Sequence, residues 1–169
     1  MNIVDKAARF ASLHHAAVGQ VRKYKYDPYI VHPASVAKIV ASVSDNEAMI
    51  AAAWLHDTVE DTTATIEDIR AEFGKEISIL VEMLTDVSVP SDGNRAKRKS
   101  IDRNHTALAS PAAKTIKLAD LIDNSSSIIE HDPKFAKVYL EEKRLLLEVL
   151  TQGDKSLWNQ AKSVLDQWG

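Results

Sequence analysis

The stretch Ala51–Asp61 reads AAAWLHDTVED and carries the most structural information in this 169-residue chain. An apolar run typical of a buried helix comes first, and four polar side chains follow it within six residues. Residues four apart share a helix face, so His56 is expected near Glu60 and Asp57 near Asp61. Carboxylates at a helix C-terminus oppose the helix dipole, and a divalent cation would reverse that penalty. Glu60 and Asp61 would then lie close enough to act on a metal-bound water.

Two other segments are needed to interpret the pair His56-Asp57. Taken alone, a His-Asp pair is as easily the polar end of a helix. His32 lies between an apolar dipeptide and Pro33, which is expected to start a helix, so its ring should point inward. Taken alone, His32 is most simply a core histidine. Asp120 lies in an otherwise apolar helical stretch, where a buried carboxylate is costly unless it is paired or coordinated. Lys117 offers the alternative, purely structural partner.

Together the three segments supply two imidazoles and two carboxylates as candidate metal ligands: His32, His56, Asp57 and Asp120. The chain has no cysteine, so thiolate ligands and disulfides are excluded. This donor set suits Mn²⁺, with Fe²⁺, Zn²⁺ and Mg²⁺ as alternatives. Four protein ligands leave open positions on an octahedral ion for water and a phosphate oxygen. Hydrolysis of a phosphate ester needs that arrangement.

The hydrophobic pattern is helical almost throughout and predicts a compact, all-α, multi-helix domain over residues 1–169, with about nine helices. Loops are expected at residues 19–32 and 87–94. Ser44 with Glu47 predicts a capping box, and Gly74 predicts a helix end. Ser110-Pro111 and Asp132-Pro133 predict two further helix starts. We find no alternating strand, glycine-rich phosphate loop or internal repeat.

Composition narrows the function classes. The chain is 45% hydrophobic and 27% charged, with a net charge of −3, as in an ordinary globular protein. No stretch approaches the ~20 apolar residues of a membrane span, and the N-terminus shows no signal peptide. A cytoplasmic protein without membrane or nucleic-acid partners is expected, and the sequence indicates no oligomeric state. Two basic clusters are either solvated faces or sites for a small polyanion: Arg22, Lys23 and Lys25, and Arg95, Lys97, Arg98, Lys99 and Arg103.

The order of these motifs resembles the HD superfamily of phosphohydrolases. The complete set of motifs is similar to the hydrolase domain of RelA/SpoT homologues. It is most similar to the stand-alone form of that domain, the small alarmone hydrolases, which include the metazoan SpoT-like hydrolase. The likeness runs from about residue 5 to about residue 150. It is carried by six segments: residues 20–23 (QVRK), 28–33 (PYIVHP), 55–61 (LHDTVED), 73–74 (FG), 84–86 (LTD) and 117–120 (KLAD).

The resemblance implies a function and assigns site residues. His32, His56, Asp57 and Asp120 match the family's metal ligands, usually of Mn²⁺. Glu60 and Asp61 match its catalytic water-activating pair, while Arg22, Lys23 and Asn124 match residues that bind the nucleotide substrate. The implied reaction releases pyrophosphate from the ribose 3′ position of guanosine 3′,5′-bis(diphosphate) (ppGpp) or its triphosphate form (pppGpp). From charge alone, we expect the basic segment 95–99 to meet the 5′-phosphates.

The chain departs from the family pattern directly after residues 117–120. Arg or Lys, Leu, an aromatic residue or His, and then Asn usually follow, whereas this chain has Leu121, Ile122, Asp123 and Asn124, and then Ser125–Ser127. The base is therefore left open between guanosine and adenosine alarmones, (p)ppApp, with the 2′-phosphate of NADPH as a further alternative. A non-catalytic metal-dependent nucleotide sensor is less favoured because the Glu60-Asp61 pair is intact. The remaining histidines, His14, His15, His105 and His131, are assigned to packing, capping or solvent.

Overall fold

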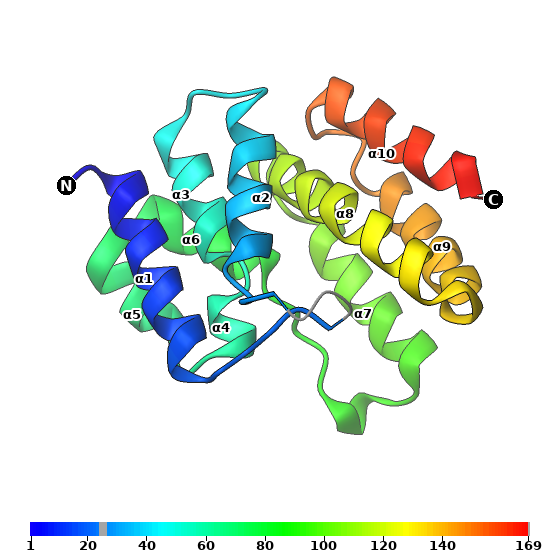
Figure 1. Ribbon diagram of the computed structural model, residues 1–169, viewed down its shortest axis with the longest axis horizontal. Helices are drawn as coiled ribbons and strands as arrows, with labels where there is room; N and C mark the ends of the chain where they lie inside the picture. The colour runs from blue at the N-terminus through cyan, green and yellow to red at the C-terminus, as the bar shows by residue number, and fades with distance from the viewer. Residues whose placement is uncertain (24–26, 169) are drawn as a thin grey trace.

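The computed structural model describes residues 1–23 and 27–168, and it is built from helices (Figure 1). Of ten α-helices in this part of the chain, α4 has four residues, so nine have eight or more, as expected. No strand occurs in the described ranges, which confirms the all-α prediction. The elements are α1 (Ile3–Ala17), α2 (Val31–Ala41), α3 (Glu47–Leu55), α4 (Thr58–Asp61), α5 (Ile66–Phe73), α6 (Lys75–Leu84), the 3₁₀ turn η1 (Pro90–Asp92), α7 (Arg95–Ala107), α8 (Pro111–His131), α9 (Pro133–Glu148) and α10 (Lys155–Trp168).

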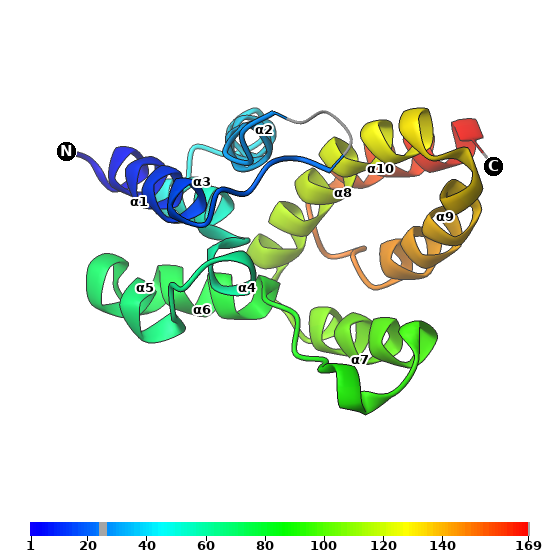
Figure 2. The ribbon, with the colours of Figure 1, turned by 60° about the horizontal axis from the view of Figure 1, so that its bottom comes forward.

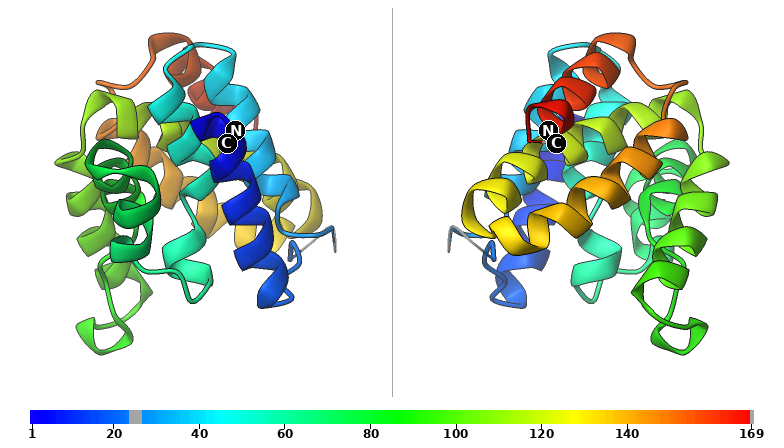
Figure 3. Two further views of the ribbon diagram at one scale, coloured as in Figure 1. Left: turned by 90° about the vertical axis from the view of Figure 1, so that its left-hand side faces the viewer. Right: turned by 90° about the vertical axis from the view of Figure 1, so that its right-hand side faces the viewer.

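Helix α8 runs through the middle of the molecule. In Figure 2 it passes diagonally between the group α1–α6 and the pair α9 and α10. It packs on α2, α3 and α6 on one side and on α9 and α10 on the other. The two termini lie at opposite ends of the longest axis (Figures 1 and 3). Residues on α8 therefore face elements from both halves of the chain.

Helix α3 is central to the first group and owes this to its composition. Ala51, Ala52 and Ala53 are fully buried, and these small side chains let α1, α2 and α6 approach the helix from different sides. A helix that is apolar around its whole circumference is expected in the interior. The end of α3 consequently delivers His56 into the protein rather than to the surface.

Several predicted helix ends are confirmed and one is wrong. Ser110 and Asp132 cap α8 and α9 immediately before a proline, and Gly74 ends α5 with a positive φ of 90°. The Ser44–Glu47 capping box does not form. Asn46 caps α3 instead, accepting a hydrogen bond from the Met49 amide at 3.1 Å. The helix begins later than predicted because Ser44 is used in the preceding turn, where its Oγ accepts from the Asn46 amide.

The helix expected to continue through Asp61 is broken after Leu55. The Thr58 hydroxyl donates to the Leu55 carbonyl at 2.7 Å, and a separate short helix, α4, follows. The four-residue spacing survives in that second piece, where the Asp61 amide donates to the Asp57 carbonyl at 3.0 Å. His56 is a member of the ligand cluster, and Glu60 on α4 lies near enough to interact electrostatically with Asp57. Across the residues that the structure describes, no helix combines the length and apolarity needed to cross a membrane.

Candidate metal centre

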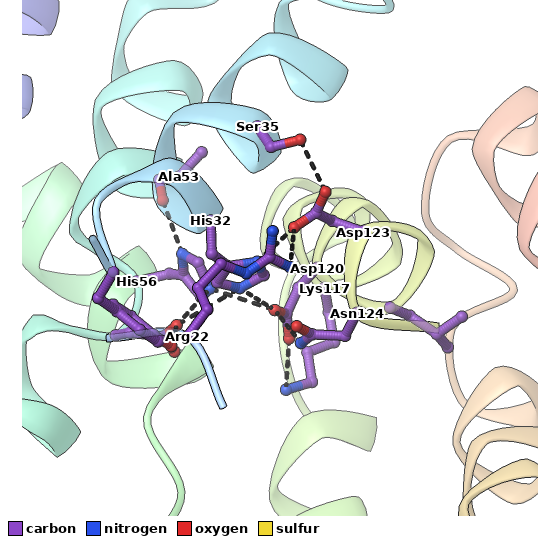
Figure 4. A network of polar contacts seen from close by, with 12 residues as sticks. Arg22, His32, Ser35, Ala53, His56, Lys117, Asp120, Asp123 and Asn124 are labelled. Atoms are coloured by element: carbon purple, nitrogen blue, oxygen red, sulfur yellow. Dashed lines mark hydrogen bonds and ion pairs between the residues drawn. The ribbon is translucent and has the colours of Figure 1, made fainter. Parts of the chain in front are cut away.

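Three parts of the fold bring the four predicted metal ligands together (Figure 4). His32 lies in the first turn of α2, His56 and Asp57 lie between α3 and α4, and Asp120 comes from α8. One ligand atom from each residue lies within 4.8 Å of all the others. His32, His56 and Asp120 are buried and Asp57 is half-buried, so the cluster is internal with one more open side.

The spacing of these atoms fits a bound cation. The Nε2 atoms of His32 and His56 lie 2.9 and 3.3 Å from Asp120 Oδ1 and 3.5 and 3.0 Å from Asp57 Oδ2. Neighbouring ligands of an octahedral ion with bonds of about 2.1 Å lie about 3 Å apart. The donor set is the imidazole-and-carboxylate type that divalent first-row metals take. These residues could therefore hold a divalent metal with little rearrangement.

The electrostatics of the cluster support the same interpretation. Burial alone would lower the pKa of His32, but hydrogen bonds to Asp120 and Asp123 raise it to about 9. Burial would raise the pKa of Asp57, but the adjacent His56 lowers it to about 2. Asp120 also has a pKa well below its usual range, because Lys117 and the two histidines outweigh its burial. A carboxylate pair this strongly favoured as anions attracts positive charge, and a metal ion can replace the protons on the histidines.

Each histidine is oriented by a hydrogen bond on the far side of its ring. His56 Nδ1 donates to the Ala53 carbonyl at 2.7 Å, and His32 Nδ1 donates to Asp123 Oδ2 at 2.6 Å. A ring whose Nδ1 carries the proton presents an Nε2 lone pair, and both Nε2 atoms face the cluster.

Asp120 is placed both to bind a metal and to form an ion pair with Lys117, the two alternatives that the sequence left open. Its Oδ1 faces the histidines, while Lys117 Nζ lies 3.3 Å from Oδ2. Asn124 donates from Nδ2 to Asp120 Oδ1 at 3.0 Å, so this predicted substrate residue also contacts a candidate ligand.

Sequence reasoning missed Tyr29, Ser35 and the structural role of Asp123. The Tyr29 hydroxyl donates to Asp57 Oδ2 at 2.6 Å, and burial beside that carboxylate raises the tyrosine's pKa, so it remains a donor. Tyr29 lies inside the segment 28–33, and that motif could have marked it as a site residue. Asp123 was noted only as a departure from a family pattern, and Ser35 follows His32 by one helical turn without any motif to mark it.

Glu60 and Asp61 lie at the rim of the cluster. Glu60 is exposed, and its Oε1 accepts a hydrogen bond from the Asp86 amide at 2.5 Å. Desolvation of its carboxyl group, together with the negative charges of Asp86 and Asp57, raises its pKa to about 8. Burial and the charge of Asp57 also raise the pKa of Asp61. Both groups therefore take up a proton more readily than ordinary carboxylates.

A cavity of about 310 Å³ opens beside His32 and is lined by Arg22, Lys23, Tyr29, His32, Arg95, Asn124, Ser127, Ile128 and Phe135. Arg22 is buried, and its Nη2 donates to Asp123 Oδ2 at 3.1 Å. The Arg95 guanidinium lies 5.0 Å from the centre of the Phe135 ring and pairs with Glu142 through two hydrogen bonds. This cavity contains all three predicted substrate-binding residues. Of the first basic cluster, Lys25 lies outside the described residues.

Three residues of the second basic cluster, Arg95, Lys99 and Arg103, line a common cavity of about 460 Å³. Arg95 also lines the cavity beside His32. Lys99 and Arg103 line a smaller one of about 50 Å³ that also contains Lys117 and Lys143. Burial and the nearby Lys117 lower the pKa of Lys143 to about 8. The expectation that the basic segment 95–99 meets the 5′-phosphates stays a prediction.

The four histidines assigned to other roles are not members of the ligand cluster, although His15 lies near enough to interact electrostatically with Asp57 and His56. His14 Nδ1 bonds to the Phe10 carbonyl, and His105 Nε2 bonds to the Glu82 carbonyl. His131 is partly exposed beside Glu130. His15 is buried, with its ring 4.8 Å from that of Tyr29 and its Nδ1 3.2 Å from Gln20 Oε1.

Comparison with known proteins places this geometry in a family. Residues 7–144 match the HD domain. The chain belongs to the HD domain family. This HD-domain chain is 39% identical over 125 residues to a probable GTP pyrophosphokinase of Mycobacterium leprae (strain TN), covering 73% of the chain and 16% of that protein. The chain thus spans about a sixth of the length of that relative.

Two further matches extend over most of both partners. The guanosine-3′,5′-bis(diphosphate) 3′-pyrophosphohydrolase MESH1 of Xenopus tropicalis is 37% identical over 126 residues, covering 72% of this chain and 67% of that protein. A solved structure, described as a metazoan ortholog of SpoT that hydrolyses ppGpp and plays a role in starvation responses, superimposes with a TM-score of 0.89. It is 27% identical and covers 100% of this chain and 97% of its own. The resemblance inferred from the motifs is confirmed.

Proposed function

We propose that this HD-domain chain is a divalent-metal-dependent phosphohydrolase that releases pyrophosphate from the ribose 3′ position of ppGpp or pppGpp. The observation that carries the proposal is the cluster of His32, His56, Asp57 and Asp120, which adjoins a cavity lined by cations. MESH1 and the metazoan SpoT ortholog, which match most of the chain, carry this activity in their descriptions. We place the enzyme in the cytoplasm, with a small-molecule nucleotide rather than a nucleic acid or membrane as its partner.

The four clustered residues would hold the metal, for which we propose Mn²⁺, with Fe²⁺, Zn²⁺ and Mg²⁺ as alternatives. When bound, the metal supplies Lewis-acid polarisation of a phosphate oxygen and a water of lowered pKa. The protein contributes the orientation of both imidazoles through Ala53 and Asp123. Tyr29 and Asn124 hold the two carboxylates by donating to Asp57 and Asp120.

Glu60 and Asp61 are proposed to accept the proton of the attacking water. The water oxygen bonds to the phosphorus next to the ribose, the bond between that phosphorus and O3′ breaks, and pyrophosphate leaves. The ribose O3′ takes up a proton to complete the reaction. A carboxylate whose pKa is raised toward the working pH is suited to this general-base role.

The cavity beside the cluster supplies the proposed substrate contacts. Phe135 and Ile128 offer apolar surface to a nucleobase, and Arg22, Lys23 and Arg95 offer positive charge to phosphate groups. Asn124 lies between this cavity and the metal cluster. Of the departures from the family pattern, Ser127 lines this cavity and Asp123 contacts Arg22 in its wall, so these two bear on the choice between ppGpp, (p)ppApp and NADPH more than on the hydrolytic machinery.

The proposal is tested by measuring pyrophosphate or phosphate release by the Mn²⁺-loaded chain from ppGpp, from its adenosine analogue and from NADPH. We expect rapid pyrophosphate release from ppGpp, abolished by His32→Gln and retained by the matched control His105→Gln, which alters a histidine bonded only to a backbone carbonyl of α6. Turnover of only the adenosine compound or NADPH would reassign the substrate. Nucleotide binding without turnover of any of the three would contradict the enzymatic proposal and favour a sensor.

A further inference from the structure

We propose that Asp123 is a positioning residue that orients His32 toward the metal and couples the metal cluster to the Arg22 wall of the nucleotide cavity. The inference rests on the proposed metal site and adds a residue that lies outside the four ligands. Asp123 occupies a position at which the chain departs from the pattern of the family it resembles.

The first step concerns the His32 ring. Asp123 follows Asp120 by three residues on α8, and it faces α2 (Figure 4). Its Oδ2 accepts from His32 Nδ1 at 2.6 Å, and its Oδ1 accepts from the Ser35 hydroxyl at 2.7 Å. The carboxylate is thus held by two groups of α2, one turn apart. Such a carboxylate fixes the ring's tautomer and plane and makes its Nε2 a stronger metal ligand.

The second histidine provides a contrast within the same cluster. His56 Nδ1 donates to the Ala53 carbonyl, a neutral acceptor supplied by its own helix. No side-chain substitution removes that acceptor. Only His32 depends on a charged side chain from another helix, 91 residues away in sequence. The cluster therefore has one ligand oriented by local backbone and one oriented by a tertiary contact.

The third step concerns Arg22. Asp123 Oδ2 also accepts from Arg22 Nη2 at 3.1 Å, and the Arg22 side chain is only 9% exposed. A buried guanidinium without a partner is strongly unfavourable, so Asp123 fixes where this cation lies. Because Arg22 lines the nucleotide cavity, one carboxylate contacts both a candidate metal ligand and a candidate substrate residue. Removing it should impair metal binding and substrate binding together.

If Asp123 only stabilised the fold through its ion pair with Arg22, its loss would lower the stability of the protein without changing metal affinity. The test therefore needs a measurement that does not depend on folding stability. We would titrate Mn²⁺ into the metal-free, full-length chain by calorimetry, comparing wild type with Asp123→Ala and Asp123→Asn. Arg22→Met removes the cationic partner of Asp123 on the cavity side. Asp166→Asn is the matched control, because Asp166 pairs with Lys162 on the solvent-exposed face of α10.

We expect Asp123→Ala to weaken Mn²⁺ binding by roughly 10- to 100-fold, the range for outer-shell partners of ligating histidines. Asp123→Asn retains an oxygen acceptor and should weaken it less. Arg22→Met and Asp166→Asn should bind Mn²⁺ within about twofold of wild type, since neither removes the His32 contact. Nitrogen-15 spectra of the His32 ring, recorded on the metal-free chain at a pH where the ring is neutral, should show the Nδ1-protonated tautomer in wild type and lose that preference in Asp123→Ala. At saturating metal, Asp123→Ala should regain kcat while keeping a raised KM.

The outcomes separate this inference from the proposed function. If the wild-type chain binds Mn²⁺ and hydrolyses its substrate while both Asp123 variants bind Mn²⁺ equally well, the positioning role is overturned and the enzyme stands. If the wild-type chain binds no divalent metal, the metal site is overturned and the inference with it. Should Asp123→Ala fail to fold, the folded Asp123→Asn variant decides: unchanged affinity and an unchanged His32 tautomer would overturn the proposal.

Discussion

The candidate metal cluster and the proposed nucleotide cavity meet at His32, yet they are built in different ways. The cluster takes its residues from α2, α8 and the α3–α4 junction, elements packed into the buried core. The cavity is walled by the segment 20–23, the beginning of α7, the second half of α8 and the start of α9, which lie toward the surface. Substitutions in the cluster should therefore change whether chemistry occurs. Substitutions in the cavity should change which nucleotide is used and how tightly it binds.

The largest effect should come from Asp120→Ala, which breaks the cluster itself. The substitution removes one proposed metal ligand and leaves Lys117 and two imidazoles without their shared partner. We expect turnover to fall by at least ~10³-fold, because metal coordination supplies several kcal/mol of transition-state stabilisation. Steady-state pyrophosphate release, with circular dichroism to confirm folding, measures this. Activity within tenfold of wild type would exclude Asp120 as a ligand.

Glu60→Gln should be next in size, with metal binding retained and turnover reduced by ~10². The pKa of Glu60 is raised to about 8, so its proton is held at neutral pH and lost as pH rises. A carboxylate base works only when deprotonated, so kcat/KM should increase with pH toward that value. A bound cation would move the apparent pKa lower. The variant should lack this ascending limb, and an unchanged pH profile would remove Glu60 from the mechanism.

A change in the cavity should separate binding from chemistry. Phe135→Ala removes apolar surface proposed to contact the base and also removes the ring beneath Arg95. We expect KM to rise by about tenfold, with kcat within about twofold, since aromatic stacking on a base contributes ~1–3 kcal/mol. Trp168→Ala, at an exposed position on α10, is the matched control. A loss confined to kcat would show that Phe135 serves the chemical step instead.

Ser35→Ala should give the smallest effect and sharpen the link between the two regions. It removes the hydroxyl that holds Asp123 Oδ1 while leaving the Asp123–His32 hydrogen bond in place. A single hydrogen bond of this kind contributes ~0.5–1.5 kcal/mol, so Mn²⁺ affinity should fall by about threefold. Calorimetric titration resolves such a change. A larger loss than in Asp123→Ala would mean that Ser35, not Asp123, positions His32.

The metal cluster could be predicted from sequence because its residues lie in recognisable local patterns. His32 precedes a helix-starting proline, the His56-Asp57 pair ends an apolar run, and Asp120 is a carboxylate in an apolar helix. Periodicity likewise predicted the all-α fold, since most helices bury one face. Each of the three ligand segments taken alone is equally compatible with a structural role, so the metal site was predicted from their combination and from the family resemblance.

What the sequence did not reveal depends on contacts between distant segments or on competition between neighbours. Asp123 pairs with Arg22 and His32 across roughly 90 to 100 residues of chain, and no local pattern marks that contact. The helix break after Leu55 arises where the Thr58 hydroxyl bonds to the backbone. Either Ser44 or Asn46 could cap α3. Asn46 does so because Ser44 accepts the Asn46 amide in the preceding turn.

The most direct test is to titrate Mn²⁺ into the metal-free chain while following pyrophosphate release from ppGpp. We predict no release before metal is added and full activity when one ion is bound per chain, with the same midpoint as calorimetric binding. Activity that persists without any divalent ion, or a fully bound ion that produces no hydrolysis, would contradict a metal-dependent hydrolase built on His32, His56, Asp57 and Asp120.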